Sequence, residues 1–194
     1  MTDDRLIVAL DVPNALAGHE MAARIGNEVR RLDGVLHSFL ELASPVGYSR
    51  EEVDLTELTT EVQDLLETEA ESKGVRLGPV QGSATATVDR EAIRRALINL
   101  VRNAIQASPP EGRVVIVISD GFQEAEIRIT DEGAGVDPKI AGQVFDPFVT
   151  GRDSGTGLGL ALVRRVIEEH EGSVTLDSHH TRGAVAVVHL PSAS

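Results

Sequence analysis

The sequence predicts a two-layer α/β sandwich, with helices packed on one face of a mixed sheet. Three observations support this fold class. From Glu51 onward, apolar residues alternate between helical and strand-like spacings. Asp120-Gly121 separates two β-rich runs, 114–119 and 126–130, which is a strong hairpin signal. The composition is 41% hydrophobic but only 3% aromatic, so the core must be built mainly from Val, Leu, Ile and Ala.

The first 50 residues are predicted to form an appendage to this sandwich. Residues 1–14 are an N-terminal tail, in which the apolar run 6–10 is typical of a buried strand. Residues 15–50 are predicted to contain a long helix that ends near residue 43, because apolar side chains recur at alternating spacings of four and three. These side chains are Ile25, Val29, Leu32, Leu36, Phe39 and Ala43. Such a seam suits a partner helix in a coiled coil or four-helix bundle.

Residues 51–194 are predicted to form the sandwich itself. Helices are expected over three ranges, 54–72, 89–107 and 158–170. Asp89 is the expected N-cap of the second helix. Strands are expected at 75–77, 85–88, 114–119, 126–130, 174–176 and 184–190.

Charge and composition exclude several classes of function. Acidic residues outnumber basic residues by 31 to 18, which gives a net charge of −13, so we expect no nucleic-acid partner. The chain has no cysteine, which excludes disulfides, thiolate metal sites and a cysteine nucleophile. No apolar run approaches the roughly 18 residues that would span a bilayer, so we expect no membrane contact by this chain. These features fit a cytoplasmic location.

Three short segments in the C-terminal half place polar residues on a helix or at turns, where they could form a functional site. Asn99 and Asn103 lie four residues apart on one predicted helix and therefore share a face, which is also common on a solvated surface. Residues 131–135 (Asp-Glu-Gly-Ala-Gly) follow a predicted strand directly, where either a turn or a site is typical. Residues 144–148 (Val-Phe-Asp-Pro-Phe), taken alone, predict a turn held by two buried rings.

The fourth segment, residues 155–160 (Gly-Thr-Gly-Leu-Gly-Leu), places glycines before a predicted helix. Glycine-rich backbone at a helix N-terminus can surround a phosphate group. The segment does not follow a strand within a βαβ unit, so it matches the dinucleotide-binding fingerprint poorly.

In this order and spacing, the four segments resemble the N, G1, F and G2 boxes of the ATP-binding catalytic domain of sensor histidine kinases. That domain belongs to the wider superfamily that includes gyrase, Hsp90 and MutL. The resemblance covers residues 51–191, and the stretches 99–104 and 148–160 look most like nitrogen-regulation-type kinases. It implies a Bergerat-type ATP-binding fold, with the nucleotide between the N-box helix and the G2 helix.

The resemblance implies a role for each matching residue. Asp131 would accept a hydrogen bond from the adenine amino group, which favours adenine over guanine. Gly133 and Gly135 would let the backbone approach the purine. Asn103 would ligate Mg²⁺ through its side-chain oxygen, and Asn99 would support it.

The phosphates would be bound by backbone amides at the start of the last helix. These amides belong to Gly155, Thr156, Gly157, Leu158 and Gly159. Residues 150–154 would form a mobile lid. Arg152 is the only cation of this lid, and it either binds a phosphate or is a solvated loop charge.

Asn99 also separates two branches of the superfamily. In the ATP-hydrolysing relatives a glutamate at this position activates water, and an amide is not a useful base at neutral pH. The sequence therefore favours transfer of the γ-phosphoryl group to another nucleophile. In histidine kinases this nucleophile is an imidazole on a separate dimerisation helix.

The histidine that would accept the phosphoryl group is not expected in this sequence. The helix that ends near residue 43 resembles the second dimerisation helix of such kinases, whereas the first, histidine-bearing helix has no match. His19 lacks the continuation that the family requires, and His37 lies off the apolar seam. The other histidines, where packing or solvation is expected, are His170, His179, His180 and His189.

Residues 4–26 resemble instead the start of an orotidine 5′-phosphate decarboxylase, whose remaining barrel is absent. A fusion, a truncation or a misassigned start would explain this segment, and coincidence is the alternative.

The sequence as a whole predicts the catalytic portion of a sensor histidine kinase. The expected cofactors are ATP and Mg²⁺, the expected partner is the receiver domain of a response regulator, and a homodimer is expected through residues 15–43. Two alternatives are an anti-sigma-factor-type serine kinase and a non-catalytic ATP-responsive interaction module. Serine kinases of this type have a similar nucleotide-binding fold but no dimerisation hairpin. The apolar seam therefore argues against this alternative.

Overall fold

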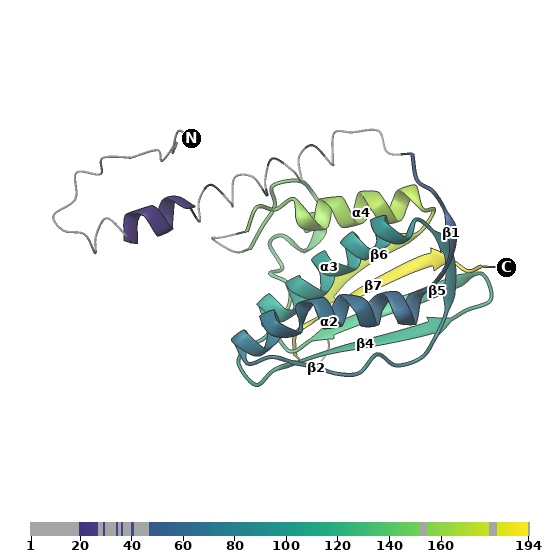
Figure 1. Ribbon diagram of the computed structural model, residues 1–194, viewed down its shortest axis with the longest axis horizontal. Helices are drawn as coiled ribbons and strands as arrows, with labels where there is room; N and C mark the ends of the chain where they lie inside the picture. Colours follow the sequence, from purple (N-terminus) through teal and green to yellow (C-terminus); the bar gives the residue numbers. More distant parts are fainter. Residues whose placement is uncertain are drawn as a thin grey trace, which may run out of the picture.

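The computed structural model describes most of the chain from residue 47 onward and part of the N-terminal appendage (Figure 1). The described ranges are 20–26, 29, 34, 36, 40, 47–151, 155–178 and 182–193. Each described residue between 20 and 40 is helical, but the helix predicted for 15–43 is not described in full and stays a prediction. The strand predicted at 6–10 and most of the decarboxylase-like segment lie outside the described residues.

The region from residue 51 to 191 forms two layers, a five-stranded sheet with three helices over one face (Figure 1). The strand order is β2-β4-β5-β7-β6; β2 is parallel to β4 and the other neighbours are antiparallel. The strands are β2 (Arg76–Leu77), β4 (Arg113–Asp120), β5 (Glu124–Asp131), β6 (Ser173–Ser178) and β7 (Ala184–Pro191). The helices are α2 (Leu55–Lys73), α3 (Arg90–Ala107) and α4 (Gly159–Glu169). The predicted two-layer α/β sandwich is thus confirmed.

A second, two-stranded sheet lies beside the first. β1 (Glu51–Asp54) pairs antiparallel with β3 (Thr85–Val88), and a bridge from Ala86 to Ser192 connects this pair to the end of β7. β3 was predicted, whereas β1 was not. The sequence of β1 has one apolar residue, Val53, and only that side chain is buried. A single apolar position cannot show the alternation on which strand prediction depends.

Asp54 and Asp89 fix where α2 and α3 begin. Asp54 Oδ1 accepts hydrogen bonds from the amides of Thr56 and Glu57, at 2.8 and 3.1 Å. Asp89 Oδ1 accepts a hydrogen bond from the amide of Ala92 at 2.9 Å. A short acidic side chain satisfies a first-turn amide in this way, so the N-cap predicted at Asp89 is confirmed.

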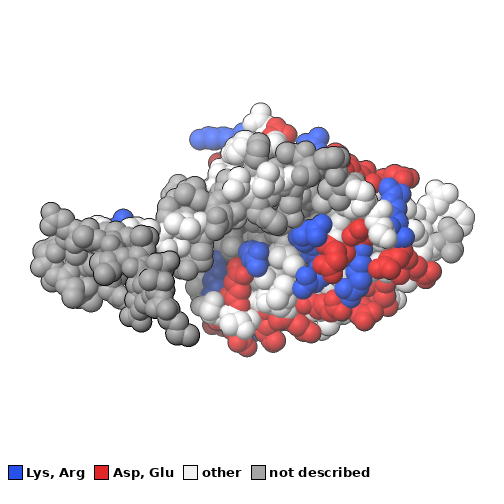
Figure 2. Space-filling view, turned by 45° about the horizontal axis from the view of Figure 1, so that its top comes forward, with Lys and Arg blue, Asp and Glu red and all other residues white. Residues whose placement is uncertain are grey.

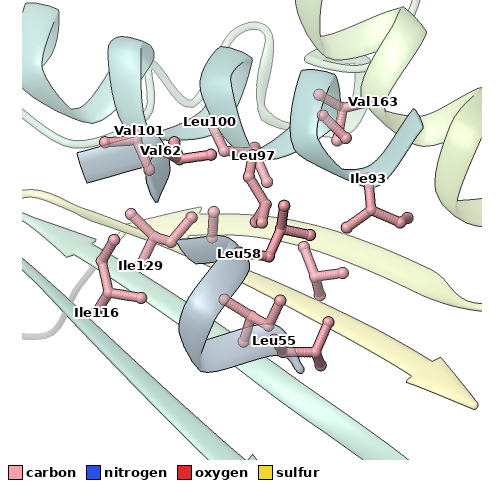
Figure 3. Close-up of a cluster of buried hydrophobic side chains, with 14 of the residues drawn as sticks. Leu55, Leu58, Val62, Ile93, Leu97, Leu100, Val101, Ile116, Ile129 and Val163 are labelled. Atoms are coloured by element: carbon pink, nitrogen blue, oxygen red, sulfur yellow. The ribbon is translucent and has the colours of Figure 1, made fainter. Parts of the chain in front are cut away.

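The core lies between the helices and the sheet (Figure 3). All three helices and the sheet contribute to one buried cluster, which includes Leu58 of α2, Leu97 of α3, Val163 of α4, Ile116 and Ile129, and each of these side chains is at most 2% exposed. Within the described residues, the buried hydrophobic set consists of Val, Leu, Ile and Ala alone, as the composition predicted. Truncating such a side chain to alanine costs about 2–5 kcal/mol of stability.

The hairpin between β4 and β5 turns at the predicted Asp-Gly pair. The amide of Gly121 donates to the carbonyl of Glu124 at 3.0 Å, and Phe122 in the turn is fully exposed. The two strands extend slightly beyond the predicted 114–119 and 126–130, which is within the usual uncertainty of element ends.

Charged side chains of both signs are interspersed on the face shown in Figure 2. Two ion pairs join α3 to α2, Arg90 with Glu61 at 2.7 Å and Arg102 with Glu69 at 2.9 Å. These two arginines are therefore neutralised locally by acidic side chains of α2. Among the described helices, none is long and apolar enough to cross a bilayer.

Candidate nucleotide-binding site

The two asparagines that the sequence singles out lie on α3, near the start of α4. Asn99 is half-buried, and its Nδ2 donates to the carbonyl of Arg95 at 3.1 Å. Its Oδ1 lies 3.0 Å from the point where a Cβ on Gly159 would stand. Asn103 is also half-buried and lies one turn further along the same face. The asparagine segment and the glycine-rich segment, far apart in the sequence, therefore meet in the fold.

Asp131 ends β5, and two backbone amides fix its carboxylate. The side chain is only 6% exposed. Its Oδ1 accepts hydrogen bonds from the amide of Gly133 at 2.7 Å and from the amide of Ala184 at 3.2 Å. Ala184 begins β7, the strand beside β5, so the carboxylate is oriented by both its own turn and the neighbouring strand.

Gly133 stands where the backbone passes close to other groups. A Cβ at this position would lie 2.7 Å from the carbonyl oxygen of Ala107 and 2.8 Å from Oδ1 of Asp131. Neither distance is compatible with a side chain, so only glycine fits without a shift of the backbone. Gly135 follows beside Ser178, whose Oγ accepts a hydrogen bond from the amide of Val136 at 3.1 Å.

A hollow of about 510 Å³ opens next to this carboxylate. Its lining residues are Ala107, Pro109, Gly133, Ala134, Arg182 and Gly183. The lining comes from the end of α3, the turn after β5 and the turn before β7. The lining combines apolar side chains with exposed backbone and one charged side chain, that of Arg182.

The glycine-rich segment leads into α4 without a capping side chain. Leu158 is the N-cap residue. Its side chain is apolar and fully buried, so it makes no capping hydrogen bond. The amide of Leu158 donates weakly to Oγ1 of Thr156 at 3.4 Å. The first turn of α4 thus presents backbone amides at the positive end of the helix, where an anion is stabilised. Gly155, Thr156 and Gly157 lie immediately before this turn, half-buried.

Gly157 connects this segment to the predicted F box. Its φ is +68°, and a Cβ there would lie 2.5 Å from the carbonyl carbon of Phe148. The amide of Phe148 donates to the carbonyl of Gly157 at 2.9 Å. The alternative of a turn held by two buried rings is wrong, because Phe148 is 64% exposed and Phe145 is only half-buried. Backbone contacts, rather than ring burial, hold the two segments together.

Part of the predicted lid lies outside the described residues. Arg152, predicted either to bind a phosphate or to be a solvated charge, is in this part, and its role stays a prediction. Before the lid, Asp146 lies 3.6 Å from Arg164 of α4 in an ion pair.

The described histidines are part of the packing, as predicted. His170 is fully buried at the end of α4, and both ring nitrogens have partners. His189 lies half-buried on β7 near Glu124 and Glu126, at 3.6 and 3.8 Å. His19, His37, His179 and His180 lie outside the described residues.

Sequence reasoning missed Arg182 and Gly183, which line the hollow. The available signal was their position immediately before the last strand. Because β7 pairs with β5, the start of β7 lies beside the end of β5, where Asp131 stands. That pairing is a tertiary contact and cannot be read from local sequence alone.

Known proteins resemble this chain in sequence and in fold. Residues 88–194 match the family described as histidine kinase-, DNA gyrase B- and HSP90-like ATPase. Sporulation kinase A of Bacillus subtilis (strain 168) is 32% identical over 168 residues, which cover 85% of this chain and 28% of the kinase.

Two solved structures are similar over nearly the whole chain. Histidine kinase ThkA in complex with response regulator protein TrrA has a TM-score of 0.78 at 26% identity, covering 95% of this chain and 53% of that one. Full-length ShkA in complex with AMPPNP has a TM-score of 0.77 at 26% identity, covering 93% and 40%.

The fold and the site define an ATP-binding domain of the α/β sandwich type. The chain belongs to the histidine kinase-, DNA gyrase B- and HSP90-like ATPase family. It spans under a third of the length of sporulation kinase A.

Proposed function

We propose that this chain is the ATP-binding catalytic domain of a two-component sensor histidine kinase. It binds Mg·ATP and presents the γ-phosphoryl group to a histidine that is not part of this chain, for relay to a response regulator receiver domain. The observation that carries the proposal is the fixed carboxylate of Asp131 beside a hollow lined by Gly133 and Gly183. Because ATP is a cytoplasmic metabolite, the proposal also places the domain on the cytoplasmic side.

Adenine selection follows from the chemistry of Asp131. Both backbone bonds use Oδ1, so the carboxylate is held in one orientation beside the hollow. A carboxylate only accepts hydrogen bonds, and adenine offers an amino donor where guanine has a carbonyl. Arg182 is the one charged residue among those that line the hollow, and we assign its planar guanidinium to packing against the base.

The phosphate end of the nucleotide fits the start of α4. Backbone amides from Gly155 to Gly159 would hold the phosphates without help from a capping side chain. Mg²⁺ would be held by Asn103 through its amide oxygen, with phosphate and water oxygens completing the shell. This donor set fits a hard cation, and no cluster of three acidic or histidine ligands competes for it within the described part of the chain. When bound, the ion neutralises charge that develops on the phosphates.

The arrangement favours phosphoryl transfer over hydrolysis. Asn99 carries a neutral amide, which is not basic enough to remove a proton from water at neutral pH. Its Nδ2 donates to the backbone carbonyl of Arg95. In the proposed reaction an imidazole nitrogen attacks the γ-phosphorus in line. The bond from phosphorus to the β–γ bridging oxygen breaks and ADP leaves, while the other imidazole nitrogen releases its proton to water.

The described helical residues of the appendage support a homodimer as the context for this transfer. Their large apolar side chains are 42–57% exposed. They are Met21, Ile25, Val29, Leu36 and Leu40. A second copy of the same helix would cover such a stripe. The named complex of ThkA with TrrA supports a receiver domain as the downstream partner.

Isothermal titration of the chain with ATP and GTP, each with Mg²⁺, tests the nucleotide assignment. We expect binding of ATP and a much weaker response to GTP. The variant Asp131→Asn should lose ATP binding, because the amide would turn its nitrogen toward the adenine amino group. Asp64→Asn, at an exposed position on α2, is the matched control and should bind as the parent does. Equal binding of ATP and GTP, or an unaffected Asp131→Asn variant, would refute the assignment.

A further inference from the structure

Residues 48–50, here called the strap, lie across the ends of two helices. The strap is the stretch just before β1, and Figure 1 shows the chain entering β1 beside one end of α4. The amide of Ser49 donates to Oδ2 of Asp89, the N-cap of α3, at 2.9 Å. Tyr48 Oη donates to Oε2 of Glu169, the last residue of α4, at 2.6 Å. One short segment thus contacts both helices that carry the candidate nucleotide site.

Arg50 strengthens the contact with α4. Its Nη1 donates to Oε1 of Glu171 at 2.6 Å, and its Nη2 donates to the backbone carbonyl of Glu169 at 2.8 Å. The second bond places a positive charge at the carbonyl end of the helix, where the helix dipole favours it. The Arg50–Glu171 pair is largely exposed, so it adds little to global stability. Its effect is expected on the position of the strap.

His170 completes the junction from inside. Its Nε2 accepts a hydrogen bond from the amide of Asp89 at 3.0 Å, and its Nδ1 lies 2.7 Å from the carbonyl of Val166. The ring of Tyr48 packs against the imidazole, with the centroids 4.6 Å apart. The strap therefore covers a fully buried side chain that joins the end of α4 to the start of α3.

The candidate nucleotide site lies at the opposite end of α4. Gly159 begins α4 beside Asn99 of α3, whereas His170 ends α4 beside Asp89. The two helices thus run antiparallel, and α4, with 11 residues, is about 16 Å long. Val163 and Ile167 of α4 are almost fully buried between these two ends. Because such a packed interface does not deform continuously, a shift of α4 at one end is expected to be felt at the other.

We propose that docking of the strap is energetically coupled to nucleotide binding through the α3–α4 pair. The inference rests on the proposed function, since it needs a nucleotide at the start of α4. Docking holds α4 in the position in which its first-turn amides and Asn103 face the same ligand. Coupling is reciprocal, so the nucleotide stabilises the docked strap to the same degree. The docking of the strap, and with it the attachment of the segment before Tyr48, therefore depends on whether the nucleotide site is occupied.

Tyr48 is a direct reporter of docking. It is the only tyrosine, and the chain has no tryptophan, so intrinsic fluorescence comes from this ring alone. Burial, and then the hydrogen bond to Glu169, raise the pKa of Tyr48 to about 12, so the phenol stays a donor at neutral pH. The other groups that face it are Arg165, Arg95 and the His170 ring. Acrylamide quenching at neutral pH then measures how accessible the docked ring is.

The experiment measures acrylamide quenching and the Kd for Mg·ATP in the same chains. We expect Mg·ATP to reduce quenching in the parent. Arg50→Ala should increase quenching and raise Kd by about fivefold, as coupling of this kind typically allows. Glu171→Gln removes only the exposed ion pair and should have a smaller effect in the same direction. Arg128→Ala, which loses an exposed pair with Glu126 on the sheet, is the control and should change neither quantity.

Two results would overturn the coupling while leaving the proposed function intact. One is a normal Kd in an Arg50→Ala chain whose tyrosine has become accessible. The other is ATP binding that leaves the quenching of Tyr48 unchanged in the parent. Absence of any ATP binding would instead refute the proposed function and the coupling together. Quenching measured without nucleotide would still show whether the strap is docked.

Discussion

The imidazole of His170 accepts a hydrogen bond from the backbone amide of Asp89, and this bond fastens the end of α4 to the start of α3. The imidazole is fully buried, and its other nitrogen lies 2.7 Å from the carbonyl of Val166. One nitrogen must accept and the other must donate, so the ring is in its neutral form with the proton on Nδ1. A histidine that sequence reasoning assigned only to packing or solvation thus has a defined structural task.

Replacing His170 with alanine is expected to lower the free energy of unfolding by about 2–4 kcal/mol, because it opens a cavity and leaves the Asp89 amide without its acceptor. Urea denaturation measures the change. His189→Ala, at a half-buried position on β7, is the matched control and should cost less than about 1 kcal/mol. Equal losses in the two variants would contradict the role assigned to His170.

Acid should weaken the same junction. Burial raises the pKa of Glu169, but hydrogen bonds from Tyr48 and Arg165 outweigh it, and the net pKa is below the ordinary 4.5. A carboxyl group whose pKa is lower in the folded chain than in the unfolded chain stabilises the fold at pH values above the unfolded pKa. That contribution is lost as the pH falls through the folded pKa. Glu169→Gln should therefore reduce the loss of Tm between about pH 6 and about pH 3, measured by circular dichroism. Glu168→Gln, on the exposed face of α4, should lose Tm as the parent does.

Gly133→Ala should strongly weaken ATP binding with a smaller effect on folding. The added Cβ would stand 2.7 Å from the Ala107 carbonyl and 2.8 Å from the Asp131 carboxylate, so the turn that lines the hollow must shift. We expect at least about a hundredfold rise in Kd, corresponding to about 2.7 kcal/mol, measured by calorimetry. Gly142→Ala, where nothing lies within 4 Å of the new Cβ, is the control. Retained affinity in Gly133→Ala would mean that the base binds elsewhere.

Most of the fold could be predicted because its signals are local. The cap at Asp89, the Asp-Gly turn and the apolar periodicity of α3 are each encoded within a few residues. The strand β1 could not be predicted, because a single buried valine shows no alternation of apolar and polar residues. Its pairing with β3 also depends on residues far along the chain. For the site, the motif positions located Asp131 and Asn99. The contributions of Arg182 and Ala184 required knowledge that β7 lies beside β5.

The assignment of Arg182 can be tested through the base rather than the phosphates. If its guanidinium packs against adenine, Arg182→Ala should weaken ATP, ADP and adenosine by a similar factor, about fivefold to tenfold. If it instead contacts a phosphate, adenosine binding should be unaffected. Calorimetric titration of the three ligands separates these outcomes. Arg113→Ala, at an exposed position that starts β4, is the control for loss of one surface charge.

Removal of the metal should reveal the role of Asn103. An amide oxygen that ligates Mg²⁺ contributes only when the ion is bound, so Asn103→Ala should weaken Mg·ATP by about tenfold. In EDTA, where ATP binds through the base and the helix amides alone, the parent and the variant should have similar Kd values. Gln106→Ala, an exposed amide on the same helix, controls for loss of a polar side chain. An equal loss with and without Mg²⁺ would show that Asn103 supports the nucleotide site through packing, and would leave the ion to the phosphates and water.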